Sequence, residues 1–220
     1  MKPVGILGGT FDPVHYGHLR PALEVLEDLE LAEVRFIPCC QPPHRQPPVA
    51  TPAQRLAMLE LALDGQAGFV ADDQELRRAG PSYTVDTLTT LRAEVGTTPL
   101  CLLLGTDAFA YLPTWHRWQV LLTLAHLVVV DRPGASPTWP DALSQLVQCH
   151  RWEHPQRLRE HPAGGILFQP VTPLAISATR VRERLGQGKS PRYLVPDKVG
   201  AYIRDRGLYR PQSPFSPSEG

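Results

Sequence analysis

The chain has 220 residues, enough for one domain with a proper core, and its 22 Lys and Arg residues balance 22 Asp and Glu residues. A net charge of zero provides no overall field to hold a nucleic-acid backbone or an anionic membrane, so we expect neither as a partner. Four cysteines without metal-ligand spacing, and no long apolar segment at the start, predict a cytoplasmic protein without signal peptide or membrane span.

Short apolar, branched segments alternate with helical patterns along the chain. Because buried strands joined by helices pack best as one sheet between two helical layers, the alternation predicts an α/β fold with a twisted, mainly parallel sheet. The predicted strands are 4–7, 34–37, 69–71, 100–104, 127–130 and 166–168.

The helix expected after the first strand has Leu19, Leu23, Leu26 and Leu29 on one face, with Pro21 in its opening turn. Residues 134–165 are predicted to form an irregular excursion with some helix. Further helices are expected at 53–63, 84–95 and 177–185, with a helical piece at 192–207. We therefore expect a main domain at 1–187, a small C-terminal helical extension at 188–210 and a disordered tail at 211–220.

The segment 8–18, Gly-Gly-Thr-Phe-Asp-Pro-Val-His-Tyr-Gly-His, directly follows the first predicted strand. Glycines let a backbone approach a bulky anion, and the first amides of the next helix point to the same place. His15 and His18 are three residues apart and belong to no hydrophobic stripe, so both can face one ligand. The bland alternative is two surface histidines. Because strand, glycines, helix start and imidazoles coincide, we predict a phosphate cradle.

Glycines and polar or charged residues follow most of the predicted strands. The carboxyl ends of parallel strands share one edge of a sheet, where ligands bind. These residues are Gly8 to Thr10, His44, Arg45, Gly105, Asp107, Arg132, Ser177, Arg180 and Arg182.

A triphosphate over Gly8 would be flanked by His15, His18 and Arg182, which are the predicted catalytic residues. Such an array suits charge stabilisation and in-line positioning, not covalent attack. We expect nucleotide binding to raise the pKa of His15 or His18, because a polyphosphate favours the charged imidazole. Mg²⁺ is expected on the substrate phosphates with few protein ligands, so no protein metal site is predicted.

Two other signals are weak. The string 150–154, His-Arg-Trp-Glu-His, matches an inverted zinc-protease motif that needs a continuous helix, and Pro155 would end such a helix. Gly188-Lys189-Ser190 lacks both the preceding strand and the earlier glycine of a P-loop. Neither string supports a function.

The opening segment with its H-x-G-H ending resembles the nucleotidyltransferase superfamily, a Rossmann-like group that transfers AMP or CMP and releases pyrophosphate. Within that group, an ordered set of segments resembles the bacterial nicotinate-mononucleotide adenylyltransferases and spans nearly the whole chain to Arg210. These segments are 42–45, 81–88, 105–109, 112–118 and 176–182. Cys39 stands where that family usually has asparagine, and Ala178 where a second serine is common.

The resemblance implies adenylyl transfer from ATP to nicotinate mononucleotide, which gives nicotinate adenine dinucleotide and pyrophosphate in NAD biosynthesis. The residues it places on ATP are Gly8, Gly9, Thr10, Phe11, His15, His18, Gly105, Asp107, Ser177 and Arg182. Those it places on the mononucleotide are His44, Arg45, Tyr83, Thr84, Asp107, Trp115 and Arg132, with Trp115 stacked on the pyridine ring.

Two alternatives compete with this hypothesis. The acceptor could be another small phosphate, such as nicotinamide mononucleotide or phosphopantetheine, or the chain could be a nucleotide sensor without turnover. Free amides where a helix begins, near Tyr83 and Thr84, favour a carboxylate over a carboxamide. The oligomeric state stays open.

Overall fold

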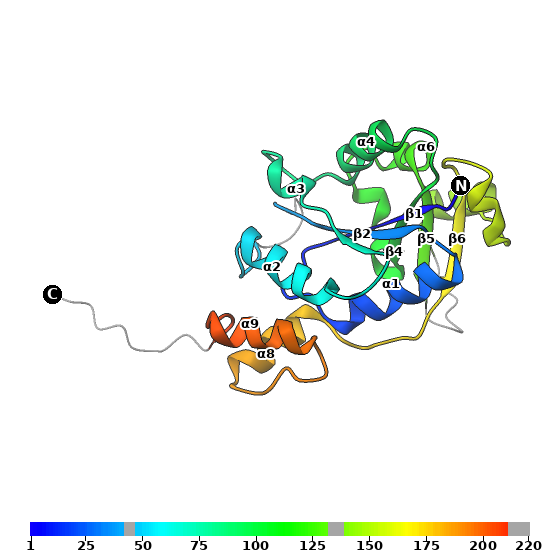
Figure 1. The fold of residues 1–220 in the computed structure, drawn as a ribbon. Coiled ribbons are helices and arrows are strands. Elements are labelled where there is room, and N and C mark those ends of the chain that lie inside the picture. The colour runs from blue at the N-terminus through cyan, green and yellow to red at the C-terminus, as the bar shows by residue number, and fades with distance from the viewer. Residues whose placement is uncertain (42–46, 132–138, 211–220) are drawn as a thin grey trace.

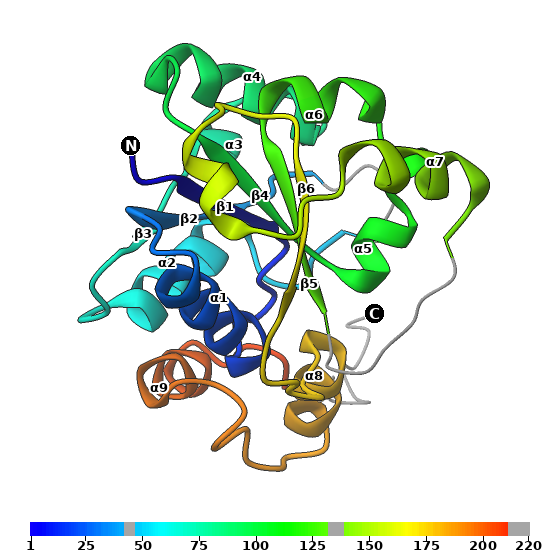
Figure 2. The same ribbon diagram turned by 90° about the vertical axis from the view of Figure 1, so that its right-hand side faces the viewer.

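The computed structural model describes residues 1–41, 47–131 and 139–210, which form three layers around a central sheet (Figures 1 and 2). The six strands lie in the order β3-β2-β1-β4-β5-β6, and every pair is parallel. This confirms the Rossmann-like, doubly wound sheet. The order reverses between β1 and β4, so their carboxyl ends flank the crevice where such sheets bind ligands. The strands are β1 (Val4–Gly9), β2 (Glu33–Pro38), β3 (Phe69–Ala71), β4 (Leu100–Gly105), β5 (His126–Asp131) and β6 (Ile166–Pro170).

Helices cover both faces of the sheet (Figures 1 and 2). One face carries α1 (Tyr16–Asp28), α2 (Pro52–Leu63), α8 (Ala178–Gly186) and α9 (Asp197–Asp205). The other carries α4 (Thr84–Val95), α5 (Thr106–Ala110), α6 (Leu121–Leu124) and α7 (Asp141–His150). Shorter elements are α3 (Gln74–Arg77), η1 (Leu112–Thr114), η2 (Trp118–Val120) and η3 (Pro155–Arg159).

The core consists of two apolar clusters separated by the sheet. Neighbouring strand residues point to opposite faces, so Phe36 packs with α1 and α2, while Ile37 packs with α4. Likewise, Leu103 belongs to the cluster on the α1 and α2 side, and Leu104 belongs to the cluster on the α4 side. A parallel strand therefore needs apolar residues on both faces, which explains its uninterrupted apolar sequence.

The first strand is longer than predicted. Gly8 and Gly9 pair with Ile37 and Pro38 of β2, so the glycines end the strand and do not form the turn after it. A glycine in a sequence suggests a break, but a neighbouring strand keeps this backbone extended. The turn toward α1 thus begins at Thr10, two residues later than predicted.

The first helix also differs in detail. Its buried residues are Leu19, Ala22 and Val25, while Leu23 is only half-buried. Successive helix residues are rotated by about 100°, so Leu23 lies at the edge of the stripe that contains Ala22. Pro21 lies inside the helix and not in its opening turn. It deprives the Gly17 carbonyl of its usual helical donor.

The other elements follow the predictions more closely. The predicted irregular stretch 134–165 contains α7 and η3, and α7 ends at His150, so the two histidines of the protease-like string do not share a helix. Near the C-terminus, α9 falls within the predicted helical piece and packs on α2. The division into domains at 187 stays a prediction, and the tail 211–220 lies outside the described residues.

Across 1–41, 47–131 and 139–210, every helix is too short or too polar to cross a bilayer. The predicted cytoplasmic location stays a prediction.

Candidate active site at the carboxyl ends of β1 and β4

Two glycines leave open space at the carboxyl ends of the two central strands. A Cβ placed on Gly8 or on Gly105 would meet no atom of residues 1–41, 47–131 or 139–210 within 4 Å. A Cβ on Gly9 would instead lie 3.0 Å from the Phe11 ring. Gly8 and Gly105 therefore let a ligand approach the backbone of β1 and β4 directly.

The turn between β1 and α1 is held tightly. Phe11 has a left-handed backbone (φ 49°), which an L residue adopts only when its surroundings require it. Its side chain is 1% exposed and packs against Phe36 and His18. Only the main chain of Phe11 can therefore face a nucleotide, although the residue was predicted as an ATP contact. Thr10 is held by Arg55, which donates a 2.8 Å hydrogen bond from Nη1 to the Thr10 carbonyl.

The two histidines lie stacked where α1 begins. Their ring centroids are 3.8 Å apart, and the His15 amide donates to Nδ1 of His18 over 3.4 Å. An accepting Nδ1 puts the proton of a neutral His18 ring on Nε2. His15 is only 4% exposed, and its Nδ1 has no hydrogen-bond partner among the described residues. The His15 ring is therefore buried, which the sequence did not indicate.

Burial keeps both imidazoles uncharged. It lowers the pKa of His15 from 6.5 to about 4. Burial also lowers the pKa of His18 well below 6.5, and the neighbouring His15 lowers it further. At neutral pH the pair consequently offers N–H donors without positive charge.

Arg182 brings the positive charge to this turn from α8. Its Nη1 donates a 2.7 Å hydrogen bond to the Asp12 carbonyl, and its Nη2 donates to the Thr179 hydroxyl over 3.3 Å. The side chain is 29% exposed, so the rest of its fork of donors can reach a ligand. Ser177 caps the same helix by accepting from the Arg180 amide over 3.3 Å. The structure thus brings Arg182 to the β1 turn, as predicted.

The predicted pyridine side is built where α4 begins and around η1. The ring of Tyr83 lies 4.4 Å from that of His116, which brings the 83–84 segment beside the residue that follows Trp115. Trp115 is half-buried against the core. Tyr83 is the residue before α4, and no side chain caps this helix among the described residues. Amides of its first turn are therefore available to an anion.

Asp107 is exposed in the first turn of α5, directly after Gly105. His44, Arg45 and Arg132 lie outside the described residues, so their roles stay predictions.

Sequence reasoning missed several buried polar residues. Arg55 is fully buried on α2, and Glu75 is buried and accepts a 2.5 Å hydrogen bond from the Thr87 hydroxyl. Burial raises the pKa of Glu75. An arginine inside the apolar face of the 53–63 helix could have revealed Arg55, since a buried cation needs a partner. No local signal marks Glu75.

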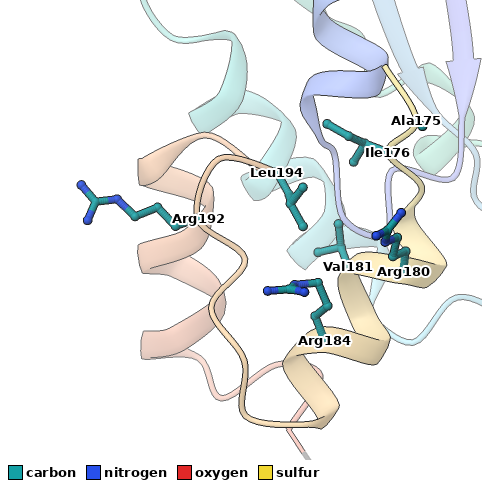
Figure 3. Close-up of a pocket in the computed structure, with 7 residues that line it drawn as sticks. All are labelled: Ala175, Ile176, Arg180, Val181, Arg184, Arg192 and Leu194. Atoms are coloured by element: carbon teal, nitrogen blue, oxygen red, sulfur yellow. The ribbon is translucent and has the colours of Figure 1, made fainter. Parts of the chain in front are cut away.

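A cavity of about 230 Å³ lies on another face of α8 (Figure 3). Arg180 and Arg184 are one helical turn apart and line it, and Arg192 points away from it. Arg180, predicted at the ligand-binding edge of the sheet, thus faces this cavity, whereas the described residues predicted to contact ATP or the mononucleotide do not line it. In a helix, residue 182 projects to the side opposite 180 and 184, so the cavity is separate from the contact between Arg182 and Asp12.

Comparisons with known proteins agree with this location. A family model described as "Cytidylyltransferase-like" matches residues 6–184, from β1 to α8. A "Probable nicotinate-nucleotide adenylyltransferase" of Methylococcus capsulatus is 54% identical over 94% of this chain and 99% of that protein. A protein of the same name from Pseudomonas fluorescens is 52% identical over 95% of this chain and 98% of its own length.

The chain belongs to the nicotinate-nucleotide adenylyltransferase family.

A solved member of this adenylyltransferase group has the same fold. "Plasmodium falciparum nicotinic acid mononucleotide adenylyltransferase complexed with NaAD" superposes with a TM-score of 0.71 at 16% identity, covering 95% of this chain and 98% of that one. At that identity the likeness concerns the fold alone. The cytidylyltransferase-like model ends within α8, before α9, whereas the relatives match 94% and more of the chain.

Proposed function

We propose that this chain transfers the adenylyl group of ATP to nicotinate mononucleotide and releases pyrophosphate, a step of NAD biosynthesis. The observation that carries the proposal is the open backbone at Gly8 and Gly105, beside the histidine pair and Arg182. The proposal is supported by relatives about 50% identical that carry the name of this activity.

The ATP phosphates would lie over the end of β1. Gly8, Gly9 and Thr10 would contact them through the backbone, and Phe11 through its main chain only. His15 and His18 would donate hydrogen bonds to the phosphates from the start of α1, and Ser177 and Arg182 would contact the phosphates from the start of α8. Gly105 and Asp107 would hold the nucleoside part beside β4.

The mononucleotide would lie between α4 and η1. Trp115 would stack on the pyridine ring, while Tyr83 and Thr84 would bind the nicotinate carboxylate with the amides of the α4 start. A carboxamide would present only one oxygen to these donors and no charge. Asp107 would hold a hydroxyl, and the phosphate would meet His44, Arg45 and Arg132.

The reaction requires positioning more than covalent chemistry. A phosphate oxygen of the mononucleotide attacks the α-phosphorus in line, the new P–O bond forms, and the bond to the bridging oxygen breaks as pyrophosphate leaves. The imidazole donors and the Arg182 guanidinium stabilise the negative charge that develops.

Magnesium would enter with ATP. Mg²⁺ keeps several waters and binds substrate phosphate oxygens, so the ion would be held mainly by the nucleotide. Bound there, Mg²⁺ would neutralise charge on the leaving pyrophosphate.

Pyrophosphate release tests the proposal. The wild-type protein with MgATP is compared on nicotinate mononucleotide, nicotinamide mononucleotide and phosphopantetheine. We expect turnover with the nicotinate substrate at least about tenfold above the amide, since unpaired polar groups penalise the wrong substrate. Absence of release with every acceptor would instead indicate a nucleotide-binding protein.

Two variants on one helix refine the test. Arg182→Ala should lower kcat/KM for ATP by about 10²-fold or more, because it removes a charged donor from the phosphates. Arg184→Ala, on the opposite side of α8, removes the same side chain and should stay within about twofold. Equal losses in both would contradict the assignment of Arg182.

A further inference from the structure

The carboxylate of Asp12 joins the phosphate turn to distant parts of the chain. Asp12 is 3% exposed. Its Oδ2 accepts from the Val49 amide over 2.8 Å, and its Oδ1 accepts from the Ala50 amide over 3.0 Å. The Tyr209 hydroxyl donates to Oδ1 over 2.6 Å. With its oxygens occupied by protein donors, this carboxylate is an anchor for the turn and not a ligand for substrate.

Asp12 also sets the place of the predicted phosphate-binding arginine. Arg182 donates to the Asp12 carbonyl over 2.7 Å, and its Nη1 lies 3.8 Å from Oδ2 of the same residue. One edge of the guanidinium is thereby fixed against Asp12. A movement of Asp12 would therefore carry Arg182 with it.

Tyr209 reaches Asp12 from beyond the last helix. The chain turns back there with left-handed backbone at Gly207 (φ 62°) and at Tyr209 itself (φ 58°). Tyr209 is 8% exposed and packs in the core cluster with α1 and α2. Burial raises the pKa of its hydroxyl, and the bond to Asp12 raises it further. The phenol thus remains a hydrogen-bond donor throughout the working pH range.

Figures 1 and 2 place α8 and α9 together at the end of the molecule next to α1 and α2. A second bond links the same regions, because the Leu194 carbonyl accepts from the Tyr16 amide over 3.0 Å where α1 begins. The C-terminal segment therefore contacts this region at Asp12, before the histidine pair, and at Tyr16, between its two members.

We infer that Tyr209 is a positioning residue for adenylyl transfer, which acts through Asp12 to hold Arg182 and the turn 10–13 in place for the triphosphate. The inference rests on the proposed function. It assigns a role in the site to Tyr209, which lies beyond residue 184, where the cytidylyltransferase-like model ends. The tyrosine ring supplies packing, whereas the hydroxyl supplies the positioning, so the two contributions are separable.

The test removes only the hydroxyl. Tyr209→Phe in the full-length protein keeps the ring in the core. Tyr202→Phe is the matched control, because Tyr202 lies on α9, is half-buried and has no hydroxyl hydrogen bond among the described residues. Both are compared with the wild type by kcat, by KM for ATP and for nicotinate mononucleotide, and by thermal unfolding.

We expect Tyr209→Phe to lower kcat/KM for ATP about tenfold, the factor that a hydrogen bond to a charged group carries. The KM for nicotinate mononucleotide should stay within about twofold, as should every constant of Tyr202→Phe. If Tyr209→Phe lowers only the melting temperature, or impairs both substrates equally, the residue is structural and the inference is wrong.

A double-mutant cycle identifies the route of the effect. In an Arg182→Lys background, Tyr209→Phe should cost less than about twofold, because the guanidinium that the hydroxyl positions is already lost. Multiplicative losses would overturn the link through Asp12 and Arg182.

A measurement of MgATP binding distinguishes a failure of this inference from a failure of the proposed function. If the wild type releases no pyrophosphate, the proposed function fails. Calorimetric titration with MgATP then still decides the inference, which requires about tenfold weaker binding in Tyr209→Phe than in Tyr202→Phe.

Discussion

The buried His15 makes the stability of this protein depend on pH in a calculable way. Its pKa is about 4 in the folded protein, against 6.5 for an ordinary histidine. Between these values the unfolded chain binds more protons than the folded one, so stability rises with pH and is lost as the pH falls from 6.5 toward 4. The full difference amounts to about 3 kcal/mol, and about 2 kcal/mol of it is lost by pH 5.

The perturbation is His15→Asn, which removes the titrating ring and keeps a residue that caps helices well. Urea unfolding from pH 7.5 to pH 5 measures the free energy of unfolding of both proteins. We expect the wild type to lose about 2 kcal/mol more than the variant over this interval. The comparison is between slopes with pH, so any cavity left by the smaller side chain cancels.

An NMR titration of the His15 ring gives the same pKa directly. A midpoint near 6.5, or parallel stability curves for the two proteins, would refute the argument from burial. Bound MgATP should raise this pKa, because a polyphosphate favours the charged imidazole. Calorimetry at pH 6 in buffers of different ionisation enthalpy should then detect proton uptake on binding by the wild type and less by His15→Asn.

Three further predictions concern single side chains. Gly8→Ala fills the open end of β1, so we expect kcat/KM for ATP to fall at least about tenfold. The free energy of unfolding in urea should rise by about 0.5 kcal/mol, because alanine restricts the unfolded backbone more than glycine does. Unchanged kinetics would place the phosphates elsewhere. Trp115→Ala should raise the KM for nicotinate mononucleotide about tenfold and that for ATP less than about twofold, and equal increases would rule out stacking on the pyridine ring. Gly165→Ala would press a Cβ into the Trp152 ring and should cost about 1–3 kcal/mol in urea unfolding, with wild-type kinetics for the folded protein.

The sequence identified the strands better than the short helices. The segments 100–104 and 127–130 are recognisable because a parallel strand buried on both faces is a continuous apolar run. Elements such as α5 and α6 have only five and four residues, too few for a helical period to be visible. A packed neighbour, not local pattern, determines whether such a segment is helical.

For the site, local sequence indicated which residues could bind phosphate but not which of their atoms are available. His15, His18 and Gly8 were predicted as such residues because a strand end, glycines and a helix start are adjacent in the chain. That His15 is buried and that the Phe11 ring belongs to the core depends on the packing of β2 and α1 around them. Burial is a property of neighbours, so the spacing of a motif cannot reveal it.

By itself, the sequence determined the parallel α/β architecture and the resemblance to an adenylyltransferase family, and it predicted a phosphate cradle at the end of the first strand, because each depends on residues that are contiguous or regularly spaced. Tertiary structure alone decided how the cradle is held. Arg55 bonds to Thr10 across 45 residues and Tyr209 to Asp12 across 197. A buried polar group must find a partner, but which partner it finds is decided by the segments that the fold brings together.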